Sequence, residues 1–417
     1  MSYETWFGVV YLSGLAGELG VNVTITSVLL AAPWIGSIGQ LIGLWVLFRE
    51  TSYRSYTLKV AALARACWIV PVFTAAYWGF WTWKVQAPFP VEAWFKLTTV
   101  FACLSALLGA SSSTAWLSWV KALVPSRFQG RFFGVRQRYV MLTLAAAHFI
   151  ASYWVGWRPG GSYLGYWMLG LCALVSAGIS TFLLAKVEDA PAVKSLTGVS
   201  FWDALKEPWA DLPFRNLVIF GAVFNFAVQF VGPFFPYYFT KELHIPMSLV
   251  SLWIVLVVAG SFVTSSYWGK RIDHSKDPRG VMFFCSHLIS ISPLFYLMGS
   301  AALVKFIAPF EYFINGIAWS GFNLAIMTLL FQKSSGRNPP FYFSIHVATS
   351  GVLGALGNFL GGNLSVVLHE YGGFRACFLL GTILRFAAVY FSIPLLWGSF
   401  GEGFSKLFGS RRLSAGK

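Results

Sequence analysis

Apolar residues occur in long runs, one after another, along the whole 417-residue chain, and these runs limit its fold more than any motif does. A helix of about 20 apolar residues spans the hydrocarbon core of a bilayer. The runs therefore predict an all-α polytopic membrane protein. Twelve spans are expected, at 4–19, 24–48, 58–82, 95–120, 138–157, 164–186, 215–240, 247–268, 279–300, 305–331, 341–367 and 376–398.

The first run is the shortest, because Gly20 follows it after barely enough residues to cross the membrane. Either this helix is short and tilted, or its true start lies upstream of Met1. The run has no basic segment before it and no clear small-residue cleavage site. We therefore do not expect a cleaved signal peptide.

Charged residues make up only 11% of the chain, whereas an ordinary soluble domain has about 25%. The net charge is nevertheless +15, which fits either nucleic-acid binding or a membrane protein whose basic loops stay in the cytoplasm. If both termini are cytoplasmic, 23 of the 30 Lys and Arg lie on the cytoplasmic side and six on the other. The sequence thus predicts a multi-pass protein of the inner (cytoplasmic) membrane, with both termini in the cytoplasm and no nucleic-acid partner.

The spans divide into two sets of six. The dipeptide Glu-Leu at 18–19, after the first span, recurs at 242–243 after the seventh, and matched apolar and hydroxyl residues follow in both places. Two halves in the same orientation predict a parallel repeat. The expected domains are a first bundle at 1–186, a cytoplasmic linker at 187–214, a second bundle at 215–399 and a basic cytoplasmic tail at 400–417.

The linker contains one segment with helical periodicity. In residues 201–210, Trp202, Leu205 and Trp209 fall near one helical face, while Asp203 lies off it. This pattern is typical of a short helix that lies at the membrane surface.

Three stretches carry motifs: WLSWVKALVPSRFQGRFFGVRQR at 116–138, GPFFPYYFTKEL at 232–243 and NGIAWSGFNLA at 315–325. With them, the chain resembles a bacterial branch of the major facilitator superfamily over essentially its whole length. The resemblance implies two six-helix bundles that rock around a central site. It also implies that the seventh helix lines this site, but it does not indicate the solute.

The first of these stretches, 116–138, is basic, and it is expected to connect the fourth and fifth spans in the cytoplasm. Pro125 would end the fourth helix, and Gly130 and Gly134 would permit the turn before the fifth begins near 138. We assign Arg131 and Arg136 of this stretch to the inner gate.

The resemblance also implies a gate motif, G-x-x-x-D-R-x-G-R-R, between the second and third helices of each half. Its Asp is expected to hold the gate shut through charge pairing and a helix N-terminus. The first half lacks this Asp, whereas the second half keeps Asp273 and Arg279. Both residues are therefore assigned to the gate.

An ionisable side chain inside the hydrocarbon is costly, which makes it a functional candidate. Glu311 lies about six residues into the tenth span, and we expect it to couple transport to protons. The competing interpretation is that it reaches the outer surface or pairs with Lys305. Glu18 has a repeat partner in Glu242 and is interpreted as structural, and Arg385 is expected to extend to the surface or pair locally.

Five amide side chains in the spans are the expected substrate contacts: Asn225, Gln229, Asn315, Asn323 and Asn358. Asn225 and Gln229 have the spacing that places both on one helix face, and so do Glu311 and Asn315. The alternative for each amide is a hydrogen bond between helices.

Catalytic and metal-binding signatures do not occur in the sequence. It has no catalytic triad order, no H-E-x-x-H and no P-loop, so we expect neither an enzyme nor a cofactor. The five Cys lie inside apolar runs and are interpreted as small buried residues. His148, His287 and His346 lie on three different spans, so no metal site is expected.

Three functions remain open. The first is secondary transport of a small organic solute by alternating access, with possible coupling to protons. The second is a lipid or amphiphile flippase of the same fold, favoured by aromatic and weakly charged helices. The third is a non-transporting assembly factor, favoured by the incomplete first gate motif. The expected partners are a small-molecule solute and membrane lipids, and a monomer is expected.

Overall fold

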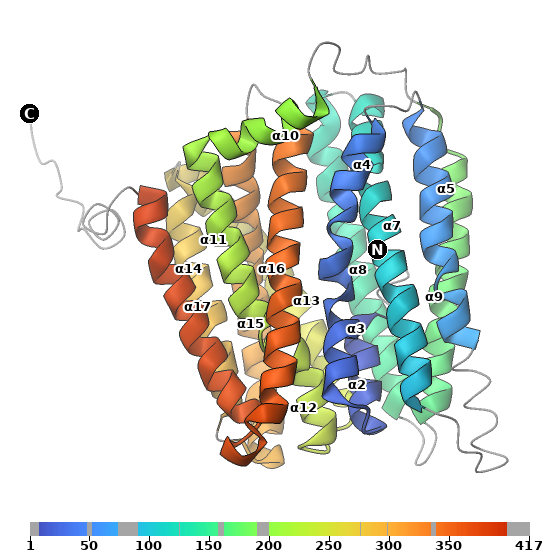
Figure 1. The fold of residues 1–417 in the computed structure, drawn as a ribbon, viewed down its shortest axis with the longest axis vertical. Helices are drawn as coiled ribbons and strands as arrows, with labels where there is room; N and C mark the ends of the chain where they lie inside the picture. Colours follow the sequence, from blue (N-terminus) through green and yellow to red (C-terminus); the bar gives the residue numbers. More distant parts are fainter. Residues whose placement is uncertain are drawn as a thin grey trace, which may run out of the picture.

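The computed structural model describes residues 8–47, 52–73, 91–124, 126–156, 162–189, 200–275, 277–297, 299–334 and 339–397. In this part of the chain every regular element is a helix. Figure 1 shows the long helices side by side, with one short helix lying across one end of the bundle. The basic tail at 400–417 lies outside the described residues.

The helices of the first half are α2 (Val9–Glu18), α3 (Val23–Gly36), α4 (Gly39–Leu47), α5 (Tyr53–Ala66), α7 (Val91–Leu123), α8 (Ser126–Gly156) and α9 (Ser162–Ala185). The connecting helix is α10 (Phe201–Ala210). Those of the second half are α11 (Leu212–Gln229), η1 (Gly232–Phe234), α12 (Phe235–Lys241), α13 (Met247–Ser275), α14 (Pro278–Ile291), η2 (Ser292–Tyr296), α15 (Ala301–Lys333), α16 (Pro339–Val367), η3 (His369–Tyr371) and α17 (Phe374–Trp397). A helical element overlaps each of the twelve expected spans.

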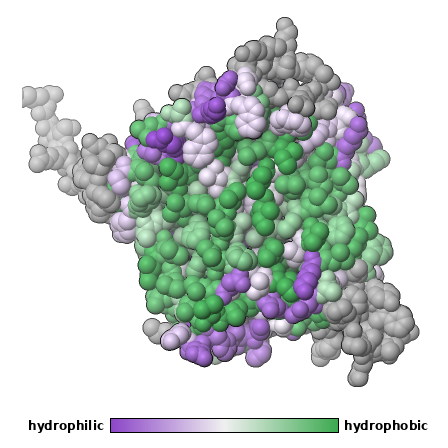
Figure 2. Space-filling model, in the orientation of Figure 1, coloured by the Kyte–Doolittle hydropathy of each residue, from purple (hydrophilic) through white to green (hydrophobic). Residues whose placement is uncertain are grey.

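Nine segments of the described chain are long and apolar enough to cross a membrane. The other three expected spans fall short for local reasons: α2 and α14 have only 10 and 14 residues, and α8 begins in the arginine-rich stretch. Figure 2 shows a wide apolar band around the middle of the visible face, with hydrophilic side chains toward its two ends. The chain is therefore an all-α, multi-pass membrane protein.

The basic stretch is helical, which corrects the expected position of the fifth span. Helix α7 ends at Leu123 and α8 already begins at Ser126, so Gly130 and Gly134 lie inside a helix and not in a turn. The expected helix end at Pro125 falls on a residue outside the described part of the chain. Counting from apolar residues alone placed the start of this helix about 12 positions too late, because its first three turns are polar.

One backbone feature recurs at matching positions of the two halves. Helix α3 begins at Val23 and α13 begins at Met247, an offset of 224 residues (247 − 23). Gly20 has φ of 66° and His244 has φ of 50°, and these residues are again 224 apart (244 − 20). In both halves, therefore, the backbone passes through the left-handed region before these helices. A histidine tolerates this conformation less well than a glycine. The shared backbone turn supports the parallel repeat.

Helix α10 covers the same residues as the expected surface helix. Leu205 packs into the cluster beneath it, and the Phe201 ring lies 6.0 Å from the ring of Phe341 on α16. Trp202 remains 65% exposed. The helix therefore rests on the second half and also reaches Leu44 of α4 through the same apolar cluster. We name its end of the bundle the α10 end, and the opposite end the α12 end.

Candidate functional site

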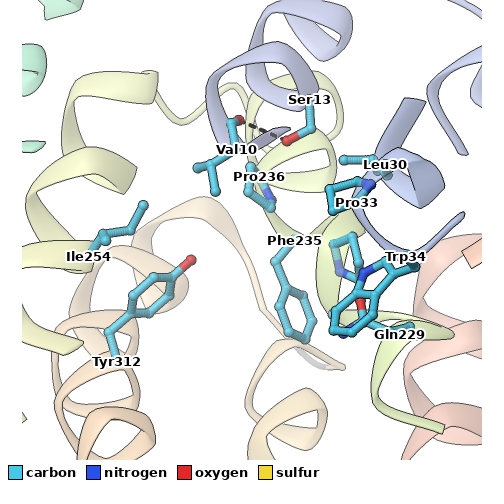
Figure 3. A pocket seen from close by; sticks show the side chains of 12 residues that line it. Val10, Ser13, Leu30, Pro33, Trp34, Gln229, Phe235, Pro236, Ile254 and Tyr312 are labelled. Atoms are coloured by element: carbon cyan, nitrogen blue, oxygen red, sulfur yellow. Dashed lines mark hydrogen bonds between the residues drawn. The ribbon is translucent and has the colours of Figure 1, made fainter. Parts of the chain in front are cut away.

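A cavity of about 350 Å³ lies between the two halves, where α11 ends. Figure 3 shows Tyr312 and Ile254 on one side of it and Trp34 and Gln229 on the other. Helices from both halves contribute its walls. The lining residues are Val10, Ser13, Leu30, Pro33, Trp34, Gln229, Gly232, Pro233, Phe235, Pro236, Ile254 and Tyr312.

The break in the seventh span shapes this cavity. Pro233 has no N–H to continue the helix, so α11 ends at Gln229 and the chain continues as η1 and then α12. Gln229, the last residue of α11, thus presents its amide to the cavity wall.

Polar groups on opposite sides of the cavity can contact a bound molecule. Figure 3 shows the Tyr312 hydroxyl directed into the space between the walls. Gln229 is held by an Nε2 hydrogen bond of 3.4 Å to the Oδ1 of Asn225. Trp34 and Phe235 add aromatic surface. The site therefore suits a small molecule with a flat or apolar face and a few hydrogen-bonding groups.

Of the five amides expected to contact substrate, Gln229 lines the cavity and the others lie elsewhere. Asn225 donates to the carbonyl oxygen of Ser350 at 2.6 Å, which joins α11 to α16. Asn358 is fully buried and donates to Leu30 at 3.3 Å, across the boundary between the halves. Asn323 is exposed, and Asn315 bonds to Glu311.

Glu311 is buried behind the cavity wall, with an exposed fraction of 4%. Its Oε1 accepts hydrogen bonds from Ser292 at 2.5 Å and Asn315 at 2.9 Å, and its Oε2 accepts one from Tyr296 at 2.6 Å. The carboxyl neither reaches the surface nor bonds to Lys305, which is exposed. Since α15 begins at Ala301, Glu311 lies about 15 Å along this helix, deeper than the sequence indicated.

The position of the Arg385 side chain differs most from the expectation. It does not extend to the surface, because its exposed fraction is only 2%. Its guanidinium donates to the carbonyl oxygens of Ile289 at 2.9 Å, Val228 at 3.0 Å and Ala227 at 3.4 Å. These carbonyls belong to two other helices, so Arg385 joins α17 to α14 and α11.

The expected gate residues are found at the α10 end. Arg279 pairs with Asp277, with an Nε–Oδ1 distance of 2.9 Å, and donates to the carbonyl oxygen of Leu396 at 2.7 Å. Asp273 is exposed on α13. Arg136 places its Cζ 4.7 Å from the centre of the Trp116 ring on α7. The side chain of Arg131 lies outside the described part.

The α12 end of the boundary between the halves is closely packed. The Tyr237 hydroxyl donates to the carbonyl oxygen of Val21 at 2.9 Å, and Thr240 donates to that of Gly14 at 3.2 Å. Gly17 faces Thr240 so closely that any side chain at this position would overlap it. Helices α2 and α12 therefore close this end of the cavity. We call this contact the α2–α12 seal.

The remaining candidates have structural contacts. Glu18 accepts a hydrogen bond from the Tyr166 hydroxyl at 3.1 Å, and His148 bonds to Tyr11 at 2.6 Å. Among the described residues, no group of three or more His, Cys, Asp or Glu could hold a metal ion.

Comparisons with known proteins agree with this geometry. Residues 217–402 match the family model of the Major Facilitator Superfamily, and no curated protein matches the sequence. A D-xylose-proton symporter has a TM-score of 0.68 at 14% identity, covering 94% of both chains. A nucleoside transporter has a TM-score of 0.64 at 14% identity, covering 94% of this chain and 96% of the other. A bacterial homologue of the iron transporter ferroportin, in its inward-facing state, has a TM-score of 0.61 at 16% identity, covering 93% and 95%.

These identities are low, so the solved structures establish the fold and not the solute. The family model covers the second half, and the fold similarity covers both halves. The second half thus matches the model of the Major Facilitator Superfamily, and the chain as a whole is similar in fold to these solved transporters.

Proposed function

We propose that the chain is a secondary transporter that moves a small organic solute across the inner membrane by alternating access, as a single chain. The observation that carries this proposal is the cavity between the two repeated halves, lined by both of them and closed at the α12 end. A site between two related halves can open to either side in turn when the halves rock. The distribution of Lys and Arg in the sequence assigns the α10 end to the cytoplasm.

The solute site is formed by the Gln229 amide and the Tyr312 hydroxyl, with Trp34 and Phe235 as apolar walls. An uncharged solute with a ring suits these groups, because burying a charge here without a partner would be costly. Two of the similar structures are named as carriers of D-xylose and of nucleosides. D-xylose and uridine are therefore the first probes for a transport assay, followed by a wider panel of small neutral solutes.

Glu311 supplies the proposed coupling to protons. It directly precedes Tyr312 of the cavity wall, and its three hydrogen-bond donors hold the carboxyl in one orientation. Ser292 and Tyr296 are hydroxyl donors that can also accept, so they can satisfy both the ionised and the protonated carboxyl. A proton could then be taken up and released as the halves rock.

Uptake of radiolabelled probes into proteoliposomes under an imposed proton gradient tests this function. We expect accumulation of at least one solute of the panel above its equilibrium level. If no member of the panel moves, in the presence or absence of the gradient, the transporter proposal is wrong. A fluorescent-lipid translocation assay on the same vesicles then tests the flippase alternative.

Replacing Gln229 by Ala should weaken solute binding by about tenfold, because a polar group of the solute would lose a buried hydrogen bond. The measurement is the KM for uptake of a transported solute. Asn323→Ala is the matched control, since this amide is exposed and lies away from the cavity. An equal rise in KM for both variants would contradict the assignment of Gln229 to the solute site.

Replacing Gly17 by Val should prevent closure of the α2–α12 seal. The new side chain would overlap Thr240 and lie too close to the carbonyl oxygen of Tyr237. We expect the cavity to become accessible from the α12 end, and a cysteine at Ser13 to react with a membrane-impermeant reagent added on that side. Gly280→Val, at a glycine with open space around it, should leave the reactivity low. Unchanged reactivity in the Gly17 variant would show that the seal does not control access.

A further inference from the structure

Two helix breaks lie behind the cavity wall. Each of them leaves backbone carbonyls that have no partner within their own helix. Helix α14 ends at Ile291, and Pro293 lacks the N–H that would have bonded to the carbonyl of Ile289. Helix α11 ends at Gln229, which places Ala227 and Val228 in its last turn. The carbonyl groups of a last turn require donors from outside the helix.

Arg385 supplies donors to both breaks. Its three guanidinium nitrogens bond to Ile289, Val228 and Ala227, one to each. A positive charge is favourable at helix C-termini, where the carbonyl dipoles point outward. The planar guanidinium reaches several acceptors at once, which a lysine ammonium cannot do in the same geometry. One side chain thus fixes the position of two broken helices.

Glu311 contacts the same break in the ninth span through residues that follow it. Two of its donors, Ser292 and Tyr296, belong to η2, which directly follows the Ile289 turn. Arg385 bonds to Ile289 and Glu311 accepts from Ser292, three residues later, so the two opposite charges flank one helix break and attract each other. In a low-dielectric interior such an interaction acts over several ångströms. Among the described residues, the other titratable groups beside Glu311 are Tyr296, which donates to the carboxyl, and Tyr312, the next residue of α15.

We propose that Arg385 is a positioning residue of the transport site. It holds the end of α11, and with it Gln229, in the cavity wall, and the charge of Glu311 sets how strongly it does so. When Glu311 takes up a proton, Arg385 loses its acidic partner and relies more on the carbonyls of Ala227 and Val228. The end of α11 is then held more firmly. This inference rests on the proposed coupling role of Glu311.

Hydrogen exchange measured by mass spectrometry on the purified full chain tests the inference without a solute. In Arg385→Gln, exchange at the backbone amides of Phe230, Val231, Gly232 and Phe234 should rise by about tenfold or more, because the charged hydrogen bonds to α11 are lost. Arg385→Lys keeps the charge and should show most of this rise. Glu311→Gln, which keeps Arg385, should slow exchange in the same segment. Arg375→Gln, on the same helix, is the control and should not change it.

Several results would overturn the inference. Unchanged exchange at 230–234 in a folded Arg385→Gln protein would show that Arg385 does not hold α11. Exchange that rises throughout the bundle would show a general structural role, and faster or unchanged exchange in Glu311→Gln would show that the two charges are independent. If Arg385→Gln does not fold, Arg385→Lys and Glu311→Gln still decide the question.

A transport measurement separates positioning from stability. For a solute that the unchanged protein moves, Arg385→Lys should raise the KM more than it lowers the maximal rate, since Gln229 is displaced while rocking continues. An effect on the maximal rate alone would contradict positioning. If the unchanged protein moves no solute, the proposed function fails, while the exchange measurements still decide whether Arg385 and Glu311 act together on α11.

Discussion

Glu311→Gln is expected to abolish proton-driven accumulation of solute and to leave downhill exchange intact. The amide has the shape of the carboxyl and can bond to the same neighbours, Ser292, Tyr296 and Asn315. It cannot bind and release a proton in the accessible pH range. The accumulation ratio under a proton gradient should therefore fall to about 1, the value for a passive carrier, because no site links the two fluxes.

Glu242→Gln is the control for this prediction, since Glu242 is an exposed carboxyl at the end of α12. It should accumulate solute as the unchanged protein does. Counterflow, in which a labelled solute exchanges with unlabelled solute inside the vesicle, measures rocking without a proton gradient and should survive in both variants. Accumulation that persists in Glu311→Gln would remove Glu311 from the coupling mechanism.

Gly361→Val is expected to prevent stable folding of the second half. Gly361 of α16 faces the backbone of Phe230, at the break between α11 and η1, and a side chain there would overlap the Phe230 carbonyl oxygen. The obstacle is backbone and not a movable side chain, so the helices must separate. Overpacking typically costs about 1–3 kcal/mol and occasionally more, and a clash with backbone is at the upper end of this range.

The measurement is the melting temperature of the purified protein, with its size-exclusion profile. Gly178→Val is the matched control, because the Gly178 position has open space around it and the helix-propensity cost is the same. We expect the control to melt near the unchanged protein and Gly361→Val to melt far lower or to aggregate. Equal melting temperatures would show that α16 and α11 can separate at little cost.

The fold was predictable because the bilayer imposes a simple rule. Each span must be a helix of sufficient apolar length, and this rule located the nine described segments that are long and apolar enough to cross a membrane. It failed at α8, where the first three turns carry arginines and extend beyond the apolar run. A rule based on apolar length cannot detect a helix that continues into water.

The candidate site was predictable only in part. Glu311 and its neighbour Asn315 were found because a buried carboxyl is rare and a spacing of four defines a shared face. Tyr312 and Trp34 were missed, because one aromatic residue in a chain with 18% aromatics gives no signal. The role of Arg385 depends on carbonyls that two distant helix breaks release, and Pro293 was the only sequence sign of one of them.

The apolar cluster at the α10 end has a thermal consequence. It joins Leu44 of the first half to Phe341 of the second, beneath Phe201 and Leu205 of α10. Separating the halves at this end would expose the cluster to water, and exposed apolar surface raises the heat capacity by about 0.45 cal/K/mol per Å². In the proposed transport cycle the open and closed forms would therefore differ in heat capacity, so the fraction of time spent in each would depend on temperature in a curved manner.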